Sequence, residues 1–320
     1  MATRDSKPIR REAAKPSDDL KEKMERNKAE LNDAVSKLTR NVAEQVGQGE
    51  PESTPERHEP TETQPLQMKL EFWPDHVRGM PNAALRGSLF SVAKIRTIAK
   101  KRELLSSVEN IEIRFKGERF NQTDLDVVEM LLHYNRGRQI DATIEFSVNK
   151  LLHDLDRATG GGDHEQLKEE LARLMGGVVE ITWKKEKRTF SGSFIRNAYR
   201  DDKTQTYVVV LDEKMIALFE QGFTWVDWEQ RRALGTNNLA KWLHGFYSTH
   251  SDPYAYKVET LKELCGSTTG RLGDFRKALH VALDKLKAVG AITDASRVTE
   301  NDSVEIVRRR HRPPKLDGKK

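Results

Sequence analysis

The second half of the chain repeats one order of elements at an offset of about 110 residues. In each copy a short strand leads into a short amphipathic helix, a glycine-containing turn, a longer amphipathic helix and further strands. The glycine turns lie at residues 159–162 and 266–270. The superposed apolar positions are Phe146 on Tyr256, Val148 on Val258, Leu151 on Leu261 and, with a small insertion, Leu174 on Leu286. This self-similarity predicts two tandem copies of one structural unit.

Apolar periodicity and capping residues place the elements of the first copy. Ser147 is expected to cap a helix over residues 148–155, and a second helix ends at Gly176 and Gly177. Strands are predicted at residues 178–183, 189–195 and 206–211, with a basic turn at 184–188.

The second copy begins after a helical stripe at residues 239–247. A short helix is expected over residues 258–265. The long helix has its apolar face at 275–289 and stops at Gly290. Two strands at 291–293 and 303–307 close the copy.

A short helix, a glycine turn, a longer helix and a hairpin are the parts of a winged helix. The fold class expected is therefore α+β, with two tandem winged-helix domains. In such a unit the second helix fits the major groove of DNA, and cations at the hairpin tip lie along phosphates. A single charged residue on an amphipathic helix is more often plain solvated surface, but two basic copies in tandem favour DNA binding.

The candidate DNA-binding residues are those near the start of the second long helix, those of the first basic turn, and those of the C-terminal run. Arg271, Arg276 and Lys277 are expected to contact bases. Phosphate contacts are expected from Thr268, Thr269, Lys184, Lys185, Lys187, Arg188, Arg308, Arg309 and Arg310.

The N-terminal part of the chain has a different composition. Residues 1–66 carry 12 basic and 14 acidic side chains and no aromatic residue, which is typical of a disordered tail. Of the net charge of +5, the remaining residues therefore carry +7, and a basic surplus there suits a polyanion or simply aids solubility. The predicted divisions are a tail (1–66), a linker (67–82), two winged helices (83–226 and 227–310) and a basic tail (311–320).

Candidates for catalysis fall short. Residues 160–162 lack the Gly-Lys-Ser/Thr that follows a phosphate-binding loop, and the histidines form no pair at metal-ligand spacing. Cys265, the one cysteine, falls on an apolar helix face and is expected in a core. We therefore expect no enzymatic activity, cofactor or metal. The lack of a disulfide, an apolar span and a signal sequence favours a cytoplasmic protein that does not contact a membrane.

Several short sequence motifs, in a fixed order along the chain, resemble those of a known family. They are Trp73-Pro74-Asp75, Met80-Pro81-Asn82, Ser88-Leu89-Phe90, Ser248-Thr249-His250, Pro253-Tyr254, Val258-Glu259-Thr260-Leu261 and Leu264-Cys265-Gly266-Ser267. From about Leu70 to about Val307 the chain resembles the TrfA-type plasmid replication initiators, which belong with the two-winged-helix initiators of iteron plasmids.

The resemblance implies binding to iterons, the direct repeats of a plasmid origin, as double-stranded DNA, followed by opening of neighbouring DNA. It also implies host partners, namely DnaA, the replicative helicase and the sliding clamp. A homodimer that uses the first winged helix is expected in equilibrium with an active monomer.

A clamp-docking word precedes the first of these motifs. Gln67, Leu70 and Phe72 fit the Gln-x-x-Leu-x-Phe pattern, which buries the two apolar side chains in a groove of the clamp. The spacing between Leu70 and Phe72 differs from the adjacent pair of the family. The alternative is that Leu70, Phe72 and Trp73 fold back onto the first domain.

Two rival functions remain open from sequence. A transcriptional repressor could use the same two DNA-binding units. A nicking enzyme would need a nucleophilic tyrosine beside a histidine-rich metal site, and none of the six tyrosines has such a neighbourhood.

Overall fold

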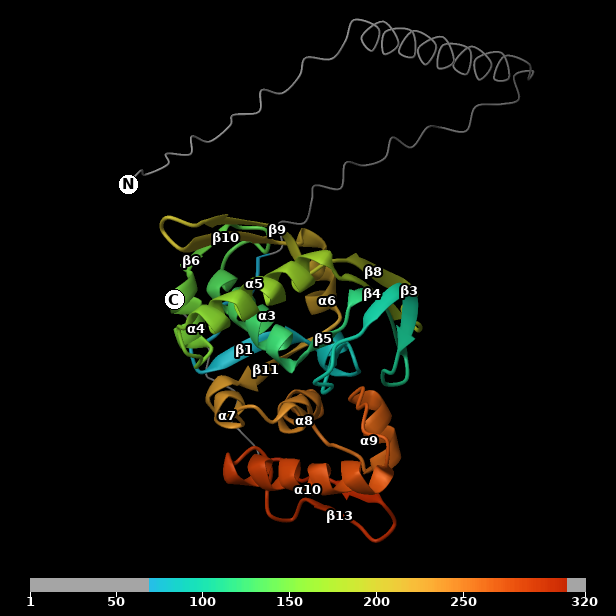
Figure 1. The fold of residues 1–320 in the computed structure, drawn as a ribbon. Coiled ribbons are helices and arrows are strands. Elements are labelled where there is room, and N and C mark those ends of the chain that lie inside the picture. Colours follow the sequence, from blue (N-terminus) through green and yellow to red (C-terminus); the bar gives the residue numbers. More distant parts are fainter. Residues whose placement is uncertain (1–68, 310–320) are drawn as a thin grey trace, which may run out of the picture. The chain divides into compact units, whose positions relative to one another are not determined.

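The computed structural model describes residues 69–309, all within one compact unit, Leu66–Lys320. Its buried apolar side chains form two cores, one drawn from residues 70–228 and the other from 234–306. We call the parts of the chain around these cores the first module and the second module. Both contain helices and sheets (Figure 1), so the predicted mixed class is confirmed. The predicted tail 1–66, Gln67, Arg310 and the basic tail 311–320 lie outside the described residues.

The second module joins helices to a three-stranded antiparallel sheet. Helix α7 (Trp228–Ala233) packs on β1 and β11 of the first module and leads into the second. The elements of the second module are α8 (Asn238–Ser248), β12 (Tyr256–Lys257), α9 (Val258–Leu264), α10 (Leu272–Ala288), β13 (Arg297–Val298) and β14 (Ser303–Glu305). The sheet order is β12-β14-β13, so the first strand pairs with the last. Phe275, Leu279 and Leu283 on one face of α10 are buried against α8 and α9.

The same order of elements recurs in the first module. It comprises β6 (Ile144–Ser147), α4 (Val148–Asp154), α5 (Gly161–Gly176), β9 (Ile195–Asp201) and β10 (Thr206–Leu211), with the sheet order β6-β10-β9. As predicted, the Ser147 side chain caps α4 by accepting a hydrogen bond from the Lys150 amide. The first amide of α4 donates to Gln205 O, and the first amide of α9 donates to Asp302 O, each at 2.9 Å. Gln205 and Asp302 both have φ of 54°, so the internal repeat extends to the turn of each hairpin.

This equivalence corrects the predicted wing of the first module. The hairpin that matches β13–β14 is β9–β10, with its turn at residues 202–205. The basic turn at 184–188 instead joins β7 (Val178–Trp183) to β8 (Arg188–Gly192), two strands inserted between α5 and β9. The predicted strand at 189–195 is thus two strands, which separate at Ser193 and Phe194 because Phe194 turns into the core at 1% exposure.

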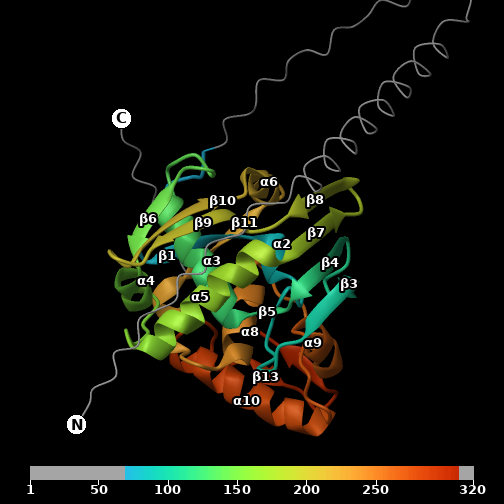
Figure 2. The same cartoon turned by 45° about the horizontal axis from the view of Figure 1, so that its top comes forward.

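The inserted hairpin belongs to a four-stranded sheet of order β3-β4-β7-β8. The other two strands are β3 (Ile98–Leu105) and β4 (Ile111–Glu118). Figure 2 shows α5 between this sheet and the β6-β10-β9 sheet, and α5 contacts both β4 and β9. Sequence periodicity did not predict β3 because only Ala99 and Leu105 of its eight residues are buried.

The predicted linker at 67–82 is wrong for the residues that the structure describes. Trp73 and Met80 are at most 1% exposed, and β1 (Val77–Pro81) pairs antiparallel with β11 (Phe223–Asp227). The segment therefore closes the first module by joining its beginning to its end. The remaining elements are α2 (Asn82–Leu85), β2 (Phe90–Ser91), β5 (Phe120–Asn121), α3 (Gln122–Asn135), η1 (Glu213–Met215) and α6 (Ile216–Glu220).

A buried charge cluster joins the two modules, and we call it the seam cluster: Asp126, Glu129, Arg231 and Lys241. Arg231 Nε lies 2.8 Å from both Asp126 Oδ1 and Glu129 Oε2. Lys241 Nζ lies 2.7 Å from Asp126 Oδ2. Burial raises the pKa of Glu129 to about 7, whereas for Asp126 the charges of Arg231 and Lys241 outweigh burial and lower the pKa.

Two hydrogen bonds also connect the modules along their contact, which we call the seam. Trp242 Nε1 donates to Gly87 O at 3.0 Å, and Arg86 Nε donates to Thr249 Oγ1 at 2.9 Å. Figure 1 shows α8 between α10 and the β1–β11 pair, which places a helix of the second module against the first.

Candidate nucleic-acid interface

The start of α10 is open and carries an unpaired cation. The helix begins at Leu272, four residues after Thr268, with Arg271 as its N-cap. No side chain caps this end, so amides of the first turn keep their hydrogen-bonding capacity. A Cβ added at Gly270 or Gly273 would meet no atom within 4 Å. A polyanion can therefore approach the backbone here, where the helix dipole also favours negative charge.

Arg271 and Lys277 are exposed, as the sequence prediction requires. Within residues 69–309, Arg271 has no side-chain hydrogen bond or ion pair. Lys277 is 83% exposed and lies 3.9 Å from Asp274. Thr268 is exposed in the turn before the helix, and Thr269 Oγ1 accepts a hydrogen bond from Ser267 Oγ. The sequence thus placed these four residues together correctly, although it put the helix start too early.

Arg276 differs from the prediction because it is engaged within the module. Its Nε donates to Asp302 Oδ1 at 2.9 Å, and its Nη2 donates to Asp302 Oδ2 at 2.5 Å. These hydrogen bonds lower the pKa of Asp302. The pair holds the β13–β14 turn against α10, so Arg276 positions this hairpin and its guanidinium is not free to contact guanine.

A groove borders α10 and reaches across the seam into the first module; we call it the seam groove. It has a volume of about 550 Å³ and is lined by Val92, Ala93, Lys94, Ile95, Thr236, Asn237, Asn238, Leu239, Ser267, Thr268, Thr269, Phe275, Ala278 and Lys285. The lining contains two lysines, several hydroxyl and amide groups and no carboxylate. It also includes the start of α8, whose N-cap is Asn237. Such a set of donors suits the phosphates of a nucleic acid.

Sequence reasoning missed Lys94, Ile95, Asn238 and Lys285 in this groove. Lys285 could have been found, since it lies on the polar face of the long helix. The other three come from segments far away in sequence, and no periodicity brings them to α10. Only the packing of the two modules against each other places them there.

The cations of the β7–β8 turn are exposed but lie on the inserted sheet. Lys184 Nζ is 3.8 Å from Glu112 Oε2, and Arg188 Nη1 is 3.8 Å from Glu220 Oε2. Lys185 and Lys187 are exposed. The exposed face of α5 is acidic, with Glu165 and Glu169 beside Lys168. The first module thus presents its cations on a sheet hairpin, whereas the second presents them on the helix itself.

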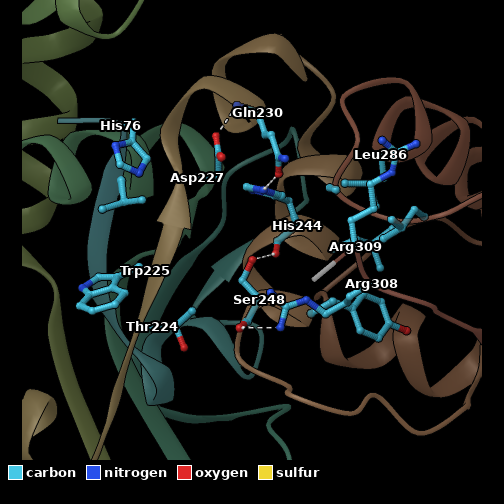
Figure 3. A pocket seen from close by; sticks show the side chains of 15 residues that line it. His76, Thr224, Trp225, Asp227, Gln230, His244, Ser248, Leu286, Arg308 and Arg309 are labelled. Carbon is cyan, nitrogen blue, oxygen red and sulfur yellow. Dashed lines mark hydrogen bonds between the residues drawn. The ribbon is translucent and has the colours of Figure 1, made fainter. Parts of the chain in front are cut away.

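Arg308 was predicted to bind phosphate, but the structure places it at the end of α8. It is half-buried and donates to His250 O at 2.6 Å, where a cation complements the helix dipole. Burial lowers the pKa of this guanidinium. Figure 3 shows Arg308 and Arg309 on one side of a cavity of about 300 Å³, with His76 and Trp225 on the other. Arg309 is exposed and agrees with the prediction in its accessibility.

In the clamp-docking motif, Leu70 packs onto the first module, as the fold-back alternative predicts. Leu70 is 2% exposed and its amide donates to Arg138 O at 2.9 Å. Phe72 is 64% exposed and lies under the Arg136 guanidinium, 5.2 Å from the ring centroid. Gln67 lies outside the described residues.

The features that bear on catalysis are few. Cys265 is buried as predicted, and burial raises the pKa of its thiol to about 12, which makes it a core residue. Among residues 69–309, no three His, Cys, Asp or Glu side chains are grouped to hold a metal ion. In the same part of the chain, no helix has the length and apolar character needed to span a bilayer.

Known proteins resemble this chain over most of its length. The family model described as "TrfA protein" matches residues 37–308. The "Plasmid replication initiator protein TrfA" of Escherichia coli is 28% identical over 231 residues, which are 70% of this chain and 60% of that protein. The match thus spans less than two thirds of the relative's length.

Solved structures show weaker likeness. Domains 2 and 3 of RctB match with a TM-score of 0.48 at 10% identity, covering 72% of this chain and 98% of that one. The Pi initiator protein in complex with iteron DNA matches with a TM-score of 0.45 at 13% identity, covering 58% and 89%. Both TM-scores are below 0.5.

Proposed function

The chain belongs to the TrfA protein family, and from this premise we propose that it is a plasmid replication initiator that binds iterons as double-stranded DNA. The name of the Escherichia coli relative supports the initiator role. The observation that carries DNA binding is the open, uncapped start of α10 beside a groove lined with lysines and without a carboxylate.

In this proposal each module is a winged helix. The strand, helix pair and hairpin of β12 to β14 form one unit, and those of β6 to β10 form the other, with β7 and β8 inserted. The matching sheet orders β6-β10-β9 and β12-β14-β13 support this assignment.

Sequence readout falls to the second module. Its helix α10 enters the major groove, where Arg271 and Lys277 reach base edges while Thr268 and Thr269 contact phosphate. Arg309 and the β7–β8 cations Lys184, Lys185, Lys187 and Arg188 add phosphate contacts that carry no sequence information. Arg276 and Arg308 support this surface from within.

The further steps of initiation are proposed from membership of the TrfA protein family. The bound protein opens neighbouring DNA and recruits DnaA, the replicative helicase and the sliding clamp of the host. It acts in the cytoplasm, without catalysing a covalent step, as a monomer released from a homodimer. Clamp docking through Leu70 and Phe72 requires the segment to leave the first module, because Leu70 is buried there.

Fluorescence anisotropy at two salt concentrations tests the DNA-binding step. One labelled duplex carries direct repeats from the origin of the protein's own plasmid, and the other carries the same bases shuffled. Preference for the repeats by a factor of about 10³ or more supports an iteron binder. Equal and steeply salt-dependent binding to both duplexes would leave only a nonspecific basic surface.

Two further assays separate the rivals. Replication of an origin plasmid in cells that supply the protein distinguishes an initiator from a repressor that only binds. Incubation with supercoiled plasmid distinguishes it from a nicking enzyme, since an initiator of this kind leaves the plasmid closed.

A further inference from the structure

Ile95 is a large apolar side chain exposed on the surface where DNA is expected. It is 78% exposed, the highest fraction among the exposed large hydrophobic residues of 69–309. It lies between β2 and β3 of the first module, yet it lines the seam groove together with Thr268, Ala278 and Lys285 of the second. The groove combines two lysines and several hydrogen-bond donors with apolar side chains, and Ile95 is an apolar side chain of its lining that the fold leaves exposed.

The segment that carries Ile95 is anchored on both sides. The Val92 amide donates to Cys265 O at 3.0 Å, and Val92 packs against the second core. On the other side, Thr97 O accepts a hydrogen bond from the Arg119 amide at 2.9 Å. These two hydrogen bonds fix both ends of the short segment that carries Ile95. The segment therefore loses little conformational entropy when it binds DNA.

Cations stand on either side of Ile95. Lys94 is exposed and forms no ion pair within the described residues. Arg96 Nη1 lies 3.6 Å from Glu118 Oε1. An apolar side chain between two cations matches the wedges that architectural proteins place in the minor groove, where they partly unstack a base step and kink the duplex by about 20–90°.

The position of the seam groove beside α10 indicates which part of a bound duplex lies next to Ile95. When α10 lies in the major groove, the strand that borders it runs through the seam groove, past Lys94, Lys285 and the hydroxyl groups of Thr268 and Thr269. What lies beyond that strand is the adjacent minor groove. Ile95 reaches the lining of the seam groove from the first module and not from α10, which is the side from which it would meet that minor groove.

From this geometry, and resting on the proposed function, we propose that Ile95 is a minor-groove wedge with which the first module bends the DNA that α10 reads. Both modules therefore act on one stretch of duplex, α10 by reading bases and Ile95 by deforming them. The deformation adds sequence preference at a step that no polar side chain reads, because flexible pyrimidine–purine steps such as TA kink most readily.

The test measures the bend and the affinity together in the full-length protein. A duplex with one repeat carries a donor dye at one end and an acceptor at the other, and anisotropy on the same duplex gives the affinity. The variant is Ile95→Ala. The matched control is Ile98→Ala, because Ile98 is 68% exposed on the neighbouring strand but does not line the groove.

The wild-type protein is expected to shorten the end-to-end distance, and Ile98→Ala to do the same. Ile95→Ala is expected to lose the bend and to bind the repeat about tenfold more weakly with an unchanged salt slope, since no phosphate contact is lost. Replacing A·T pairs by inosine·cytosine at the contacted step should keep the bend, and replacing them by guanine·cytosine should lose it, because only guanine adds a minor-groove amino group.

An unchanged bend in Ile95→Ala, or an equal loss in Ile98→Ala, overturns the wedge while leaving the initiator proposal intact. A wild-type protein that does not prefer the repeat at all removes the proposed function and the wedge with it. The two failures are distinguished by the wild-type affinity ratio.

Discussion

Arg271 and Arg276 lie five residues apart, and both were expected to contact bases. Of these two, Arg276 is held by Asp302, whereas Arg271 has no side-chain hydrogen bond or ion pair within residues 69–309. Sequence spacing assigned the helix correctly but could not distinguish these side chains. Their difference arises from Asp302, which is brought to α10 by the turn between β13 and β14.

Replacing Arg271 by Ala should weaken binding to the repeats about 10- to 100-fold while leaving the shuffled duplex nearly unaffected. The reason is that a bidentate contact to guanine adds affinity only where guanine is present. Lys185→Ala is the matched control, because loss of a phosphate contact weakens both duplexes alike and lowers the salt slope by about 1. Anisotropy on both duplexes measures this, and equal losses in Arg271→Ala would assign Arg271 to phosphate instead.

His133 links the stability of the first module to pH. Its side chain is 7% exposed, and its Nδ1 accepts a hydrogen bond from Trp73 Nε1 at 3.1 Å. Burial, followed by the nearby charges of Arg78 and Arg136, lowers the pKa of His133 to about 3.

Because the unfolded chain protonates His133 near pH 6.5 and the native state does not, the free energy of unfolding should fall as pH drops below 6.5. The loss should reach about 2 kcal/mol at pH 5. His133→Gln keeps an acceptor for Trp73 and should remove this part of the pH dependence in denaturant titrations. His153→Gln, at a histidine whose side chain is 87% exposed, should retain the wild-type dependence.

At the scale of elements, the amphipathic helices and the capping residue Ser147 were predictable from sequence, because their periodicity reflects one buried face. The four-stranded sheet β3-β4-β7-β8 and the β1–β11 pair were not predictable from sequence. β3 buries two of its residues, and β1 is completed by β11, more than a hundred residues later in the chain. The basic turn at 184–188 was assigned to the wing because sequence order cannot show that β7 pairs with β4.

Two substitutions in the segment before β1 test whether this segment folds back onto the first module. Leu70→Ala should lower the free energy of unfolding by about 2–5 kcal/mol, since it removes a side chain that is 2% exposed. Phe72→Ala removes a ring that is 64% exposed and should change stability by less than about 0.5 kcal/mol. Chemical denaturation of the two variants measures this. Equal stabilities would mean that Leu70 does not pack in solution.

At the scale of the whole described unit, we expect the seam cluster to make the two modules unfold as one cooperative structure. Arg231→Met should cost about 3–5 kcal/mol, because it leaves the carboxylate of Glu129 buried without a cation and leaves Asp126 with Lys241 alone. Arg232→Met is the control, as Arg232 is 40% exposed and pairs with Asp156 at the surface.

Replacing Asp126, Glu129, Arg231 and Lys241 together by Asn, Gln, Met and Met should recover much of the lost stability, since no charge of the seam cluster is then left unpaired. Denaturant unfolding followed by tryptophan fluorescence measures both effects. A single transition in the wild-type protein that splits in Arg231→Met would confirm the coupling, whereas an unchanged single transition would refute it.

The seam also limits how such proteins can diversify. Its contacts pair a residue of one module with a residue of the other: Lys241 with Asp126, Trp242 with Gly87, and Arg86 with Thr249. Recombination that joined the second module of one family member to the first module of another would separate these partners. On the proposed function, new DNA specificities should therefore arise by point changes on the exposed face of α10, while the two modules are inherited as a pair.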